Sequence, residues 1–282
     1  MERDSLIPAD ENRRMFDAIA RRYDVMNRLI SLGQDRRWRR RAADALGVAP
    51  GGRYLDIGTG TGDICVEILR RGSAARVTGI DPSEAMLAIA QAKLRRAGFT
   101  VEGCAGAQVR ECDETDQRTH DRTGARPHDP THVADVSPGR SNAEAAPSAV
   151  LEVGDALALP YPDGVFAGAI SAFVIRNVED RVQALREMRR VIRPNGRIVI
   201  LELTVPRGRI MRQLHRLYGA TVLPLAARAF SNREAYRYLV KSVREFPAPD
   251  QFVDLMRQAG IREPACVSLS GGIVTLFTGL AL

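Results

Sequence analysis

A run of closely spaced glycines between acidic residues is the clearest chemical signal in the sequence. Residues 58–62 read Gly-Thr-Gly-Thr-Gly and follow an apolar stretch, 54–57, that contains Asp56. Glycines let a backbone turn tightly and approach a ligand that a Cβ would exclude. Asp81 ends the next apolar stretch, where its carboxylate can accept hydrogen bonds from both hydroxyls of a ribose. The loop and this acid together predict a site for a nucleoside-type cofactor.

The spacing of the glycines separates two classes of cofactor. A dinucleotide-binding loop has the pattern Gly-x-Gly-x-x-Gly, and the helix that follows it receives a pyrophosphate at its N-terminus. Here the pattern is Gly-x-Gly-x-Gly, followed at once by Asp63. Because a carboxylate at that position repels a pyrophosphate, the loop favours a cofactor without phosphate over NAD.

The elements around the loop indicate where it lies. Apolar, β-branched stretches alternate with stretches of helical periodicity, which predicts an α/β fold with a Rossmann-like, doubly wound and mostly parallel sheet. In such a sheet, ligands bind outside the carboxyl ends of the strands. The expected strands are 54–57, 76–81, 150–153, 165–172, 197–202 and 273–282, and the expected helices are 63–71, 83–98, 180–192, 209–239 and 249–260.

One segment does not fit this alternation. Between Val101 and Val150 there is no Leu, Ile, Met, Phe, Tyr or Trp, and nine acidic residues outnumber five basic ones. A segment of this composition cannot bury enough apolar surface to offset its ordering entropy. We therefore expect one α/β core domain over 51–282, interrupted by a disordered insertion at 102–148, and a separate helical segment at 1–50 that covers the site.

Composition excludes several classes of protein. The chain has 282 residues, 45% hydrophobic residues and a formal net charge of +7. No apolar run approaches the ~20 residues of a membrane span, and the first residues lack the apolar core of a signal peptide. Four cysteines without paired spacing argue against a disulfide scaffold. We expect a cytoplasmic protein.

The glycine loop resembles the Asp-x-Gly-x-Gly-x-Gly motif of class I S-adenosylmethionine-dependent methyltransferases. This resemblance implies S-adenosylmethionine as the cofactor, held by Asp56, Gly58, Gly60, Thr61 and Asp81. It also implies that Asp155 reaches the adenine amino group and that Ala156 lies against the ring. A structural turn in an unrelated α/β protein is the competing interpretation of the loop, and a plain turn residue is that of Asp155.

Further motifs resemble the quinone-biosynthesis C-methyltransferases, the family of demethylmenaquinone methyltransferase and its ubiquinone-pathway counterpart. The motifs are Tyr-Asp-x-Met-Asn within 15–27, Arg-Asn-Val within 171–178, and the stretches 190–204 and 231–247. The resemblance covers the chain except for the insertion and the extreme ends. The chain departs from it at Asp35, Asn195 and Ala172, where the family often has His, Gly and Ser.

The resemblance implies methyl transfer to a ring carbon of a polyprenyl quinol, with demethylmenaquinol as the favoured acceptor. Arg176 and Asn177 are then the catalytic candidates, since they follow the fourth strand where the acceptor should lie. Tyr23, Asn27 and Tyr236 are the candidates for closing over the quinol. Two alternatives stay open, namely that Arg176 only pairs with an acid such as Glu179, and that the tyrosines are packing residues.

The expected partners follow from the quinol and from the charge. Two basic runs, Arg36–Arg41 and Arg207–Arg216, predict either peripheral contact with an anionic membrane at its inner face or ordinary solvated surface. We expect no nucleic acid and consider a homodimer compatible with the sequence. We also expect no metal, because the candidate ligands lack paired spacing: Cys104, Cys112, His120, His128 and His132. The alternative functions are methylation of another phenolic molecule and non-catalytic binding of the cofactor.

Overall fold

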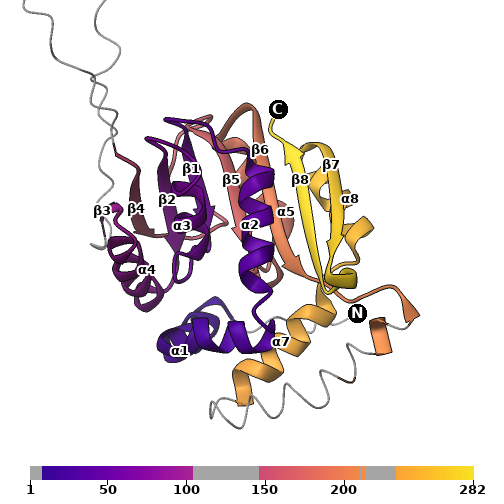
Figure 1. Ribbon diagram of the computed structural model, residues 1–282. Helices are drawn as coiled ribbons and strands as arrows, with labels where there is room; N and C mark the ends of the chain where they lie inside the picture. The colour runs from indigo at the N-terminus through magenta and orange to yellow at the C-terminus, as the bar shows by residue number, and fades with distance from the viewer. Residues whose placement is uncertain (1–7, 104–145, 210, 214–216, 218–232) are drawn as a thin grey trace, which may run out of the picture.

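The computed structural model describes residues 8–103, 146–209, 211–213, 217 and 233–282 (Figure 1). Helices and strands alternate through most of this range, as the sequence pattern predicts. In chain order they are α1 (Ala9–Ile30), α2 (Asp35–Leu46), β1 (Arg53–Ile57), α3 (Asp63–Leu69), β2 (Arg76–Asp81), α4 (Glu84–Arg96), β3 (Thr100–Glu102), β4 (Ser148–Val153), β5 (Phe166–Ala172), the 3₁₀ turn η1 (Ile175–Asn177), α5 (Arg181–Arg190), β6 (Ile192–Leu203), α7 (Arg233–Glu245), α8 (Pro249–Gln258), β7 (Arg262–Leu269), the 3₁₀ turn η2 (Ser270–Gly272) and β8 (Val274–Leu280).

The strands form one eight-stranded sheet in the order β3-β4-β2-β1-β5-β6-β8-β7, in which only β8 and β7 run antiparallel to their neighbours. One apolar core lies between the sheet and α2, α3 and α4, and a second lies between the sheet and α5 and α8. In β1, Tyr54 packs in the first core and Leu55 in the second. Because both faces are covered, the central strands read as nearly continuous apolar runs. The expected doubly wound α/β fold is confirmed.

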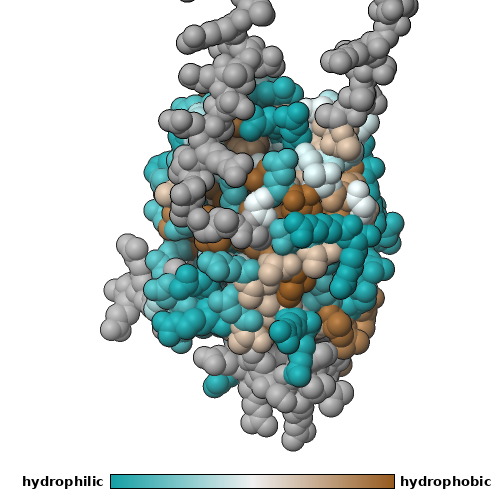
Figure 2. Space-filling view, turned by 90° about the vertical axis from the view of Figure 1, so that its left-hand side faces the viewer, coloured by the Kyte–Doolittle hydropathy of each residue, from teal (hydrophilic) through white to brown (hydrophobic). Residues whose placement is uncertain are grey.

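The two N-terminal helices differ in what they cover. α2 packs on β5, β6 and α3 and so belongs to one helical layer of the sheet, whereas α1 contacts α4 and crosses below the carboxyl ends of the strands (Figure 1). Figure 2 shows the side of the molecule that carries α4 and the β3–β4 edge, where hydrophilic side chains surround smaller hydrophobic areas. Among the described helices, none is long and apolar enough to cross a membrane.

The structure differs from the sequence-based expectations at several boundaries. β7 was not expected, because it is an edge strand whose residues are mostly exposed and so lack the apolar alternation of a buried strand. β6 begins at Ile192 and includes Asn195, whose φ of 63° is the left-handed conformation that glycine favours and asparagine tolerates. The helix expected at 209–239 lies mostly outside the described residues, and α7 extends past its expected end to Glu245.

The insertion expected at 102–148 starts and ends inside the sheet. β3 and β4 are parallel neighbours, and Glu102 pairs with Val150 while Thr100 pairs with Ser148. Residues 102 and 148 are therefore strand residues rather than parts of the insertion. The segment between them, 104–145, lies outside the described residues.

We predict that Phe277→Ala lowers the free energy of unfolding by about 3–5 kcal/mol, because it leaves a cavity in a packed core. Phe277 is fully buried, with its ring centroid 4.7 Å from that of Phe252 and 6.4 Å from that of Phe246. Urea denaturation measures the loss. The control is Val267→Ala on the exposed edge strand, which should change stability by less than ~0.5 kcal/mol. A loss below 1 kcal/mol for Phe277→Ala would contradict this packing.

Candidate active site

A cavity of about 460 Å³ lies at the carboxyl ends of β1, β2, β4 and β5, and side chains of α1 form part of its wall. Its volume lies in the range of small-molecule sites. Most of the residues predicted from the sequence line it together: Tyr23, Asp56, Gly58, Gly60, Thr61, Asp81, Asp155, Ala156 and Asn177. Arg176 and Asn27 are not among the lining residues, and the side chain of Tyr236 lies outside the described part of the chain.

The glycine loop between β1 and α3 needs its glycines for separate reasons. Gly58, Gly60 and Gly62 all have positive φ, at 68°, 54° and 80°. A Cβ on Gly58 would lie 2.3 Å from Val174 Cγ2, and one on Gly62 would lie 3.0 Å from Ala90 Cβ on α4. A Cβ on Gly60 would meet no protein atom closer than 4.0 Å. The first and third glycines therefore allow packing, and the middle one leaves backbone open to the cavity.

Asp56, at the end of β1, is a buried carboxyl group with one unsatisfied oxygen. Its Oδ2 accepts hydrogen bonds from Thr59 Oγ1 at 2.7 Å and from the Cys65 thiol at 3.4 Å. Its Oδ1 has no hydrogen-bond partner among the described residues. Burial raises the pKa of Asp56 to about 6. A buried carboxyl group at the wall of a cavity is suited to a ligand that brings a donor or a positive charge.

Asp81 ends the neighbouring strand β2 and is held by backbone groups. Its Oδ2 accepts from the Gly60 N–H at 2.8 Å and its Oδ1 from the Ser83 N–H at 2.9 Å. Burial raises the pKa of Asp81 to about 6 as well. Asp155 is different, since it lies in an exposed turn in which its Oδ1 accepts from the Leu157 N–H at 2.9 Å. Asp155 is therefore both a turn residue and part of the cavity wall.

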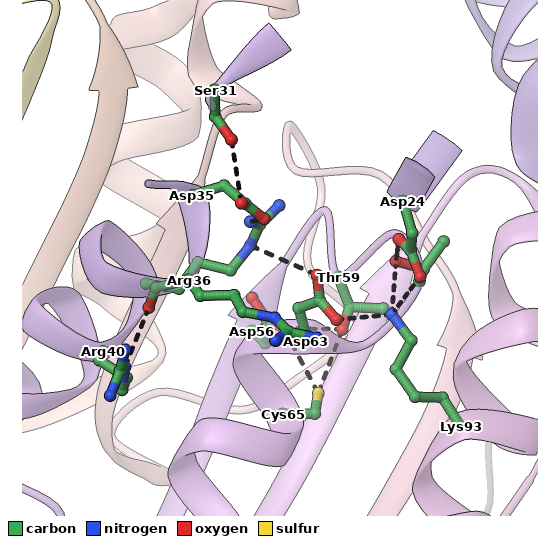
Figure 3. A network of polar contacts seen from close by, with 12 residues as sticks. Asp24, Ser31, Asp35, Arg36, Arg40, Asp56, Thr59, Asp63, Cys65 and Lys93 are labelled. Carbon is green, nitrogen blue, oxygen red and sulfur yellow. Dashed lines mark hydrogen bonds and ion pairs between the residues drawn. The ribbon is translucent and has the colours of Figure 1, made fainter. Parts of the chain in front are cut away.

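Polar contacts that the sequence analysis did not identify hold α1 against the loop (Figure 3). Lys93 of α4 forms ion pairs with Asp24 at 2.7 Å and with Asp63 at 2.5 Å. Thr61 donates to Asp24 at 2.6 Å, and Ser83 donates to Asp17 of α1 at 2.5 Å. Asp24 belongs to the Tyr-Asp-x-Met-Asn motif, which was the one available signal for this contact. These bonds place the cavity-lining side of α1 over the glycine loop.

Arg176 lies behind the cavity wall in a buried ion pair. Its Nη1 is 2.9 Å from Glu202 Oε1, and the two side chains are 6% and 0% exposed. Its backbone N–H donates to Glu202 Oε2 at 3.1 Å, and Nη1 also donates to the carbonyl of Phe173. The acid paired with Arg176 is thus Glu202 on β6 rather than Glu179.

Asn177 is the member of the Arg-Asn-Val motif that reaches the cavity. Its Oδ1 accepts from the hydroxyl of Tyr238 on α7 at 3.2 Å, and burial raises the pKa of Tyr238 to about 12. Sequence reasoning missed Tyr238 and named Tyr236 instead. The two differ by two positions on a helix and so project from different faces.

Phe173 forms another part of the wall in an uncommon conformation. Its φ is 64°, which costs a non-glycine residue of order 1–3 kcal/mol. Its N–H donates to the Leu201 carbonyl at 2.7 Å, and its ring packs edge-on against Trp38 and under the guanidinium of Arg39, 5.3 Å from the ring centroid. Bonds to β6 and contacts with α2 therefore hold this residue at the cavity.

The first basic run is not uniformly surface charge. Arg39 is buried, pairs with Asp35 at 2.8 Å and lies 3.7 Å from Asp63. In the second run, Arg207 pairs with Asp250, and Arg216 lies outside the described residues.

Among the described residues, no group of three or more His, Cys, Asp or Glu side chains is placed to hold a metal ion. The histidines and cysteines of the insertion fall in 104–145, outside that part of the chain.

Solved structures of methyltransferases share this fold. An S-adenosylmethionine-dependent methyltransferase from Thermotoga maritima aligns with a TM-score of 0.56 and 19% identity, covering 95% of this chain and 99% of that one. Another from Aquifex aeolicus aligns with a TM-score of 0.53 and 15% identity, covering 94% and 98%. At these identities the likeness concerns the fold alone.

Sequence comparison defines the family. The ubiE/COQ5 methyltransferase family model matches residues 8–122 and 136–281. The ubiquinone/menaquinone biosynthesis C-methyltransferase UbiE of Geobacter sulfurreducens is 38% identical over 95% of this chain and 87% of its own length. The demethylmenaquinone methyltransferase of Thermus thermophilus is 38% identical over 87% of this chain and 90% of its own. The chain therefore belongs to the ubiE/COQ5 methyltransferase family and is an S-adenosylmethionine-dependent C-methyltransferase, as its motifs indicated.

Proposed function

We propose that this chain transfers the methyl group of S-adenosylmethionine to a ring carbon of demethylmenaquinol and so forms menaquinol. The observation that carries the proposal is the cavity, in which the glycine loop and two buried carboxyl groups meet Asn177 and the wall formed by α1. Relatives from Thermus thermophilus and Deinococcus radiodurans, both named demethylmenaquinone methyltransferase, favour a naphthoquinol over a benzoquinol.

The side chains that line the cavity fit the chemistry of this cofactor. When bound, S-adenosylmethionine supplies an electrophilic methyl group on a positively charged sulfur. Asp56 presents a buried oxygen without a partner, and Asp81 lies beside it at the end of the adjacent strand. Both carboxylates favour a cationic ligand and disfavour a phosphate. We assign the ribose hydroxyls to Asp81, the adenine to Asp155 and Ala156, and the amino acid end to the loop Gly58–Thr61 with Asp56.

The acceptor is the demanding partner, because a ring carbon is a weak nucleophile. The new carbon–carbon bond forms as the carbon–sulfur bond breaks, and the ring carbon then loses its proton. The protein must align the carbon with the methyl group and stabilise charge on the quinol oxygen. We assign the second task to the amide of Asn177, whose orientation the Tyr238 hydroxyl sets. Tyr23 lines the cavity and is placed to cover the quinol ring.

Arg176 serves this reaction as a positioning residue rather than as a contact to the acceptor. Its guanidinium and backbone bind Glu202, which ties η1 to β6 directly beside Asn177. Asn27 and Tyr236 stay predictions as further contacts to the quinol. We also propose that residues 1–50 act as the cover of the site through α1, which the bonds of Asp17 and Asp24 hold in place.

The acceptor class also bears on where the protein works. A polyprenyl quinol is a lipid-soluble molecule, so we propose a cytoplasmic protein that associates peripherally with the inner face of the membrane. Homodimerisation stays a prediction, which the mass from light scattering would check.

The direct experiment supplies purified protein with labelled S-adenosylmethionine and either demethylmenaquinol or the ubiquinone-pathway precursor. We expect label in both the naphthoquinol product and, more slowly, the benzoquinol product. Binding of the cofactor without transfer to either acceptor would contradict the proposed function, and a faster reaction with the benzoquinol would reverse the choice of acceptor.

The ion pair predicts how Arg176 variants behave. Arg176→Ala leaves Glu202 buried and unpaired, which should cost about 3–5 kcal/mol of stability. The double variant Arg176→Met with Glu202→Leu removes both charges and should regain most of that loss in urea denaturation. A stable Arg176→Ala variant would show that the pair is not structural.

Asn177→Ala should keep cofactor affinity within about twofold and lower kcat at least tenfold, because it removes a contact to the acceptor.

Cofactor binding should depend on pH through the two carboxyl groups. Their pKa values of about 6 mean that both protonate as the pH falls from 7 to 5, so a cationic ligand that needs the ionised form binds more weakly at pH 5. The dissociation constant should rise about tenfold over this range for each carboxylate required. Calorimetric titration measures it, and Asp81→Asn should bind more weakly at pH 7 but with a shallower pH dependence. An affinity that is constant from pH 7 to 5 would contradict these assignments.

A further inference from the structure

The outer face of α1 carries exposed apolar side chains in a row. Val25, Leu29 and Leu32 are 57%, 54% and 73% exposed, and their spacing of four and three residues puts them on one side of the helix and its C-terminal turn. Leu32 has a φ of 51°, an unfavourable conformation for a leucine that leaves its side chain in solvent. The opposite side of the helix packs inward through Phe16 and Tyr23, among others.

Positive charge flanks this row. The exposed residues Arg14, Arg21, Arg22 and Arg28 fall on the same side of α1 by helical periodicity. In the described part of the chain, no carboxylate lies within ion-pair distance of Arg21, Arg22 or Arg28.

The two acids in the middle of this helix are engaged with the protein body, whereas Asp10 and Glu11 are exposed in its first turn. Asp24 forms an ion pair with Lys93 (Figure 3) and accepts a hydrogen bond from Thr61, and Asp17 accepts one from Ser83. Their charge is therefore not available to neutralise the arginines. The outer face, defined by Arg14, Arg21, Arg22, Val25, Arg28, Leu29 and Leu32, combines apolar side chains with an excess of positive charge. Glu11 lies on the same side near Arg14, so the excess is at the end of the helix that carries the apolar row.

We propose that this outer face of α1 docks on an anionic lipid bilayer. Apolar side chains that enter the headgroup region, flanked by arginines that meet anionic headgroups, are the features by which helices bind in the plane of a membrane surface. The proposal rests on the proposed function, because a prenylated quinol is dissolved in the bilayer. Phe16 and Tyr23 on the other side of α1 line the cavity, so the bilayer surface would lie about one helix diameter, ~10 Å, from the site.

Two other occupants fit the face less well. A second copy of the chain docked face to face would bring four arginines of each copy together, and the exposed acids at the start of the helix are too few to offset the repulsion. A nucleic acid would meet the arginines, but the row between them has no aromatic side chain for base stacking.

Vesicle pelleting tests the surface without any methyl transfer. The wild-type chain should pellet with vesicles of phosphatidylglycerol and phosphatidylcholine and much less with phosphatidylcholine alone, and salt should weaken the binding. Arg21→Gln with Arg22→Gln should lower the affinity about 30-fold, from ~1 kcal/mol for each arginine at an anionic surface. Val25→Ser, Leu29→Ser and Leu32→Ser combined should lower it on the same vesicles with little change in salt dependence.

Matched control variants separate this face from general surface effects. Val267→Ser replaces an equally exposed valine on β7, 55% exposed, and Arg95→Gln with Arg96→Gln removes two exposed arginines of α4. These controls should bind vesicles like the wild type. Equal loss in the controls, binding that ignores lipid charge, or unchanged binding of the α1 variants would overturn the proposal. So would a loss confined to self-association in light scattering or to RNA binding.

Activity assays distinguish a failure of this inference from a failure of the proposed function. The α1 variants should methylate a quinol embedded in vesicles more slowly than the wild type, and should methylate a water-soluble quinol without a prenyl tail at the wild-type rate. If the wild type methylates neither acceptor, the proposed function is wrong. The pelleting result then still shows whether the outer face of α1 binds an anionic bilayer. Equal rates of variant and wild type on the embedded quinol would contradict the docking role.

Discussion

The site in this structure depends on two carboxyl groups that are buried at the ends of adjacent parallel strands. Asp56 and Asp81 close β1 and β2, which are neighbours in the sheet, and both are nearly completely buried. Burying a charge is costly, and the cost shows in pKa values of about 6. The chain offsets part of it with the hydroxyl of Thr59 and the backbone N–H groups of Gly60 and Ser83. In the proposed function a cationic cofactor supplies what remains, and the glycine-rich turn leaves the backbone beside these acids open to the cavity.

Ion pairs, one of them half-buried and one buried, join further elements around the cavity. Lys93 forms ion pairs with Asp24 and Asp63 and thereby joins α4 to α1 and to the start of α3. Arg176 and Glu202 join η1 to β6 in the same way. Each pair uses electrostatics to fix an element that carries a cavity residue, and Asp63 itself lines the cavity. α1 then has one side committed to the cavity and the other exposed.

Local features of the site could be predicted from the sequence, and long-range ones could not. The glycine turn follows Asp56 directly, and Asp81 is the last residue of the next apolar stretch, so the sequence pattern itself places both acids at strand ends. The partner of Arg176 is Glu202, 26 residues away on the next strand, and nothing local indicates which acid it meets. Lys93 reaches Asp63 across 30 residues for the same reason. The fold class could be predicted from the alternating periodicity, whereas β7 was not predicted because an exposed edge strand has no apolar pattern.

Carbon methylation of a quinol is the central claim, and the position of the transferred methyl group tests it most directly. The measurement is the NMR spectrum of the product formed from demethylmenaquinol and ¹³C-methyl-labelled S-adenosylmethionine. We predict a single labelled methyl group bonded to a ring carbon, with the ring hydrogen at that carbon lost. A methyl group on a hydroxyl oxygen, or no labelled quinol while the cofactor is bound, would contradict the account.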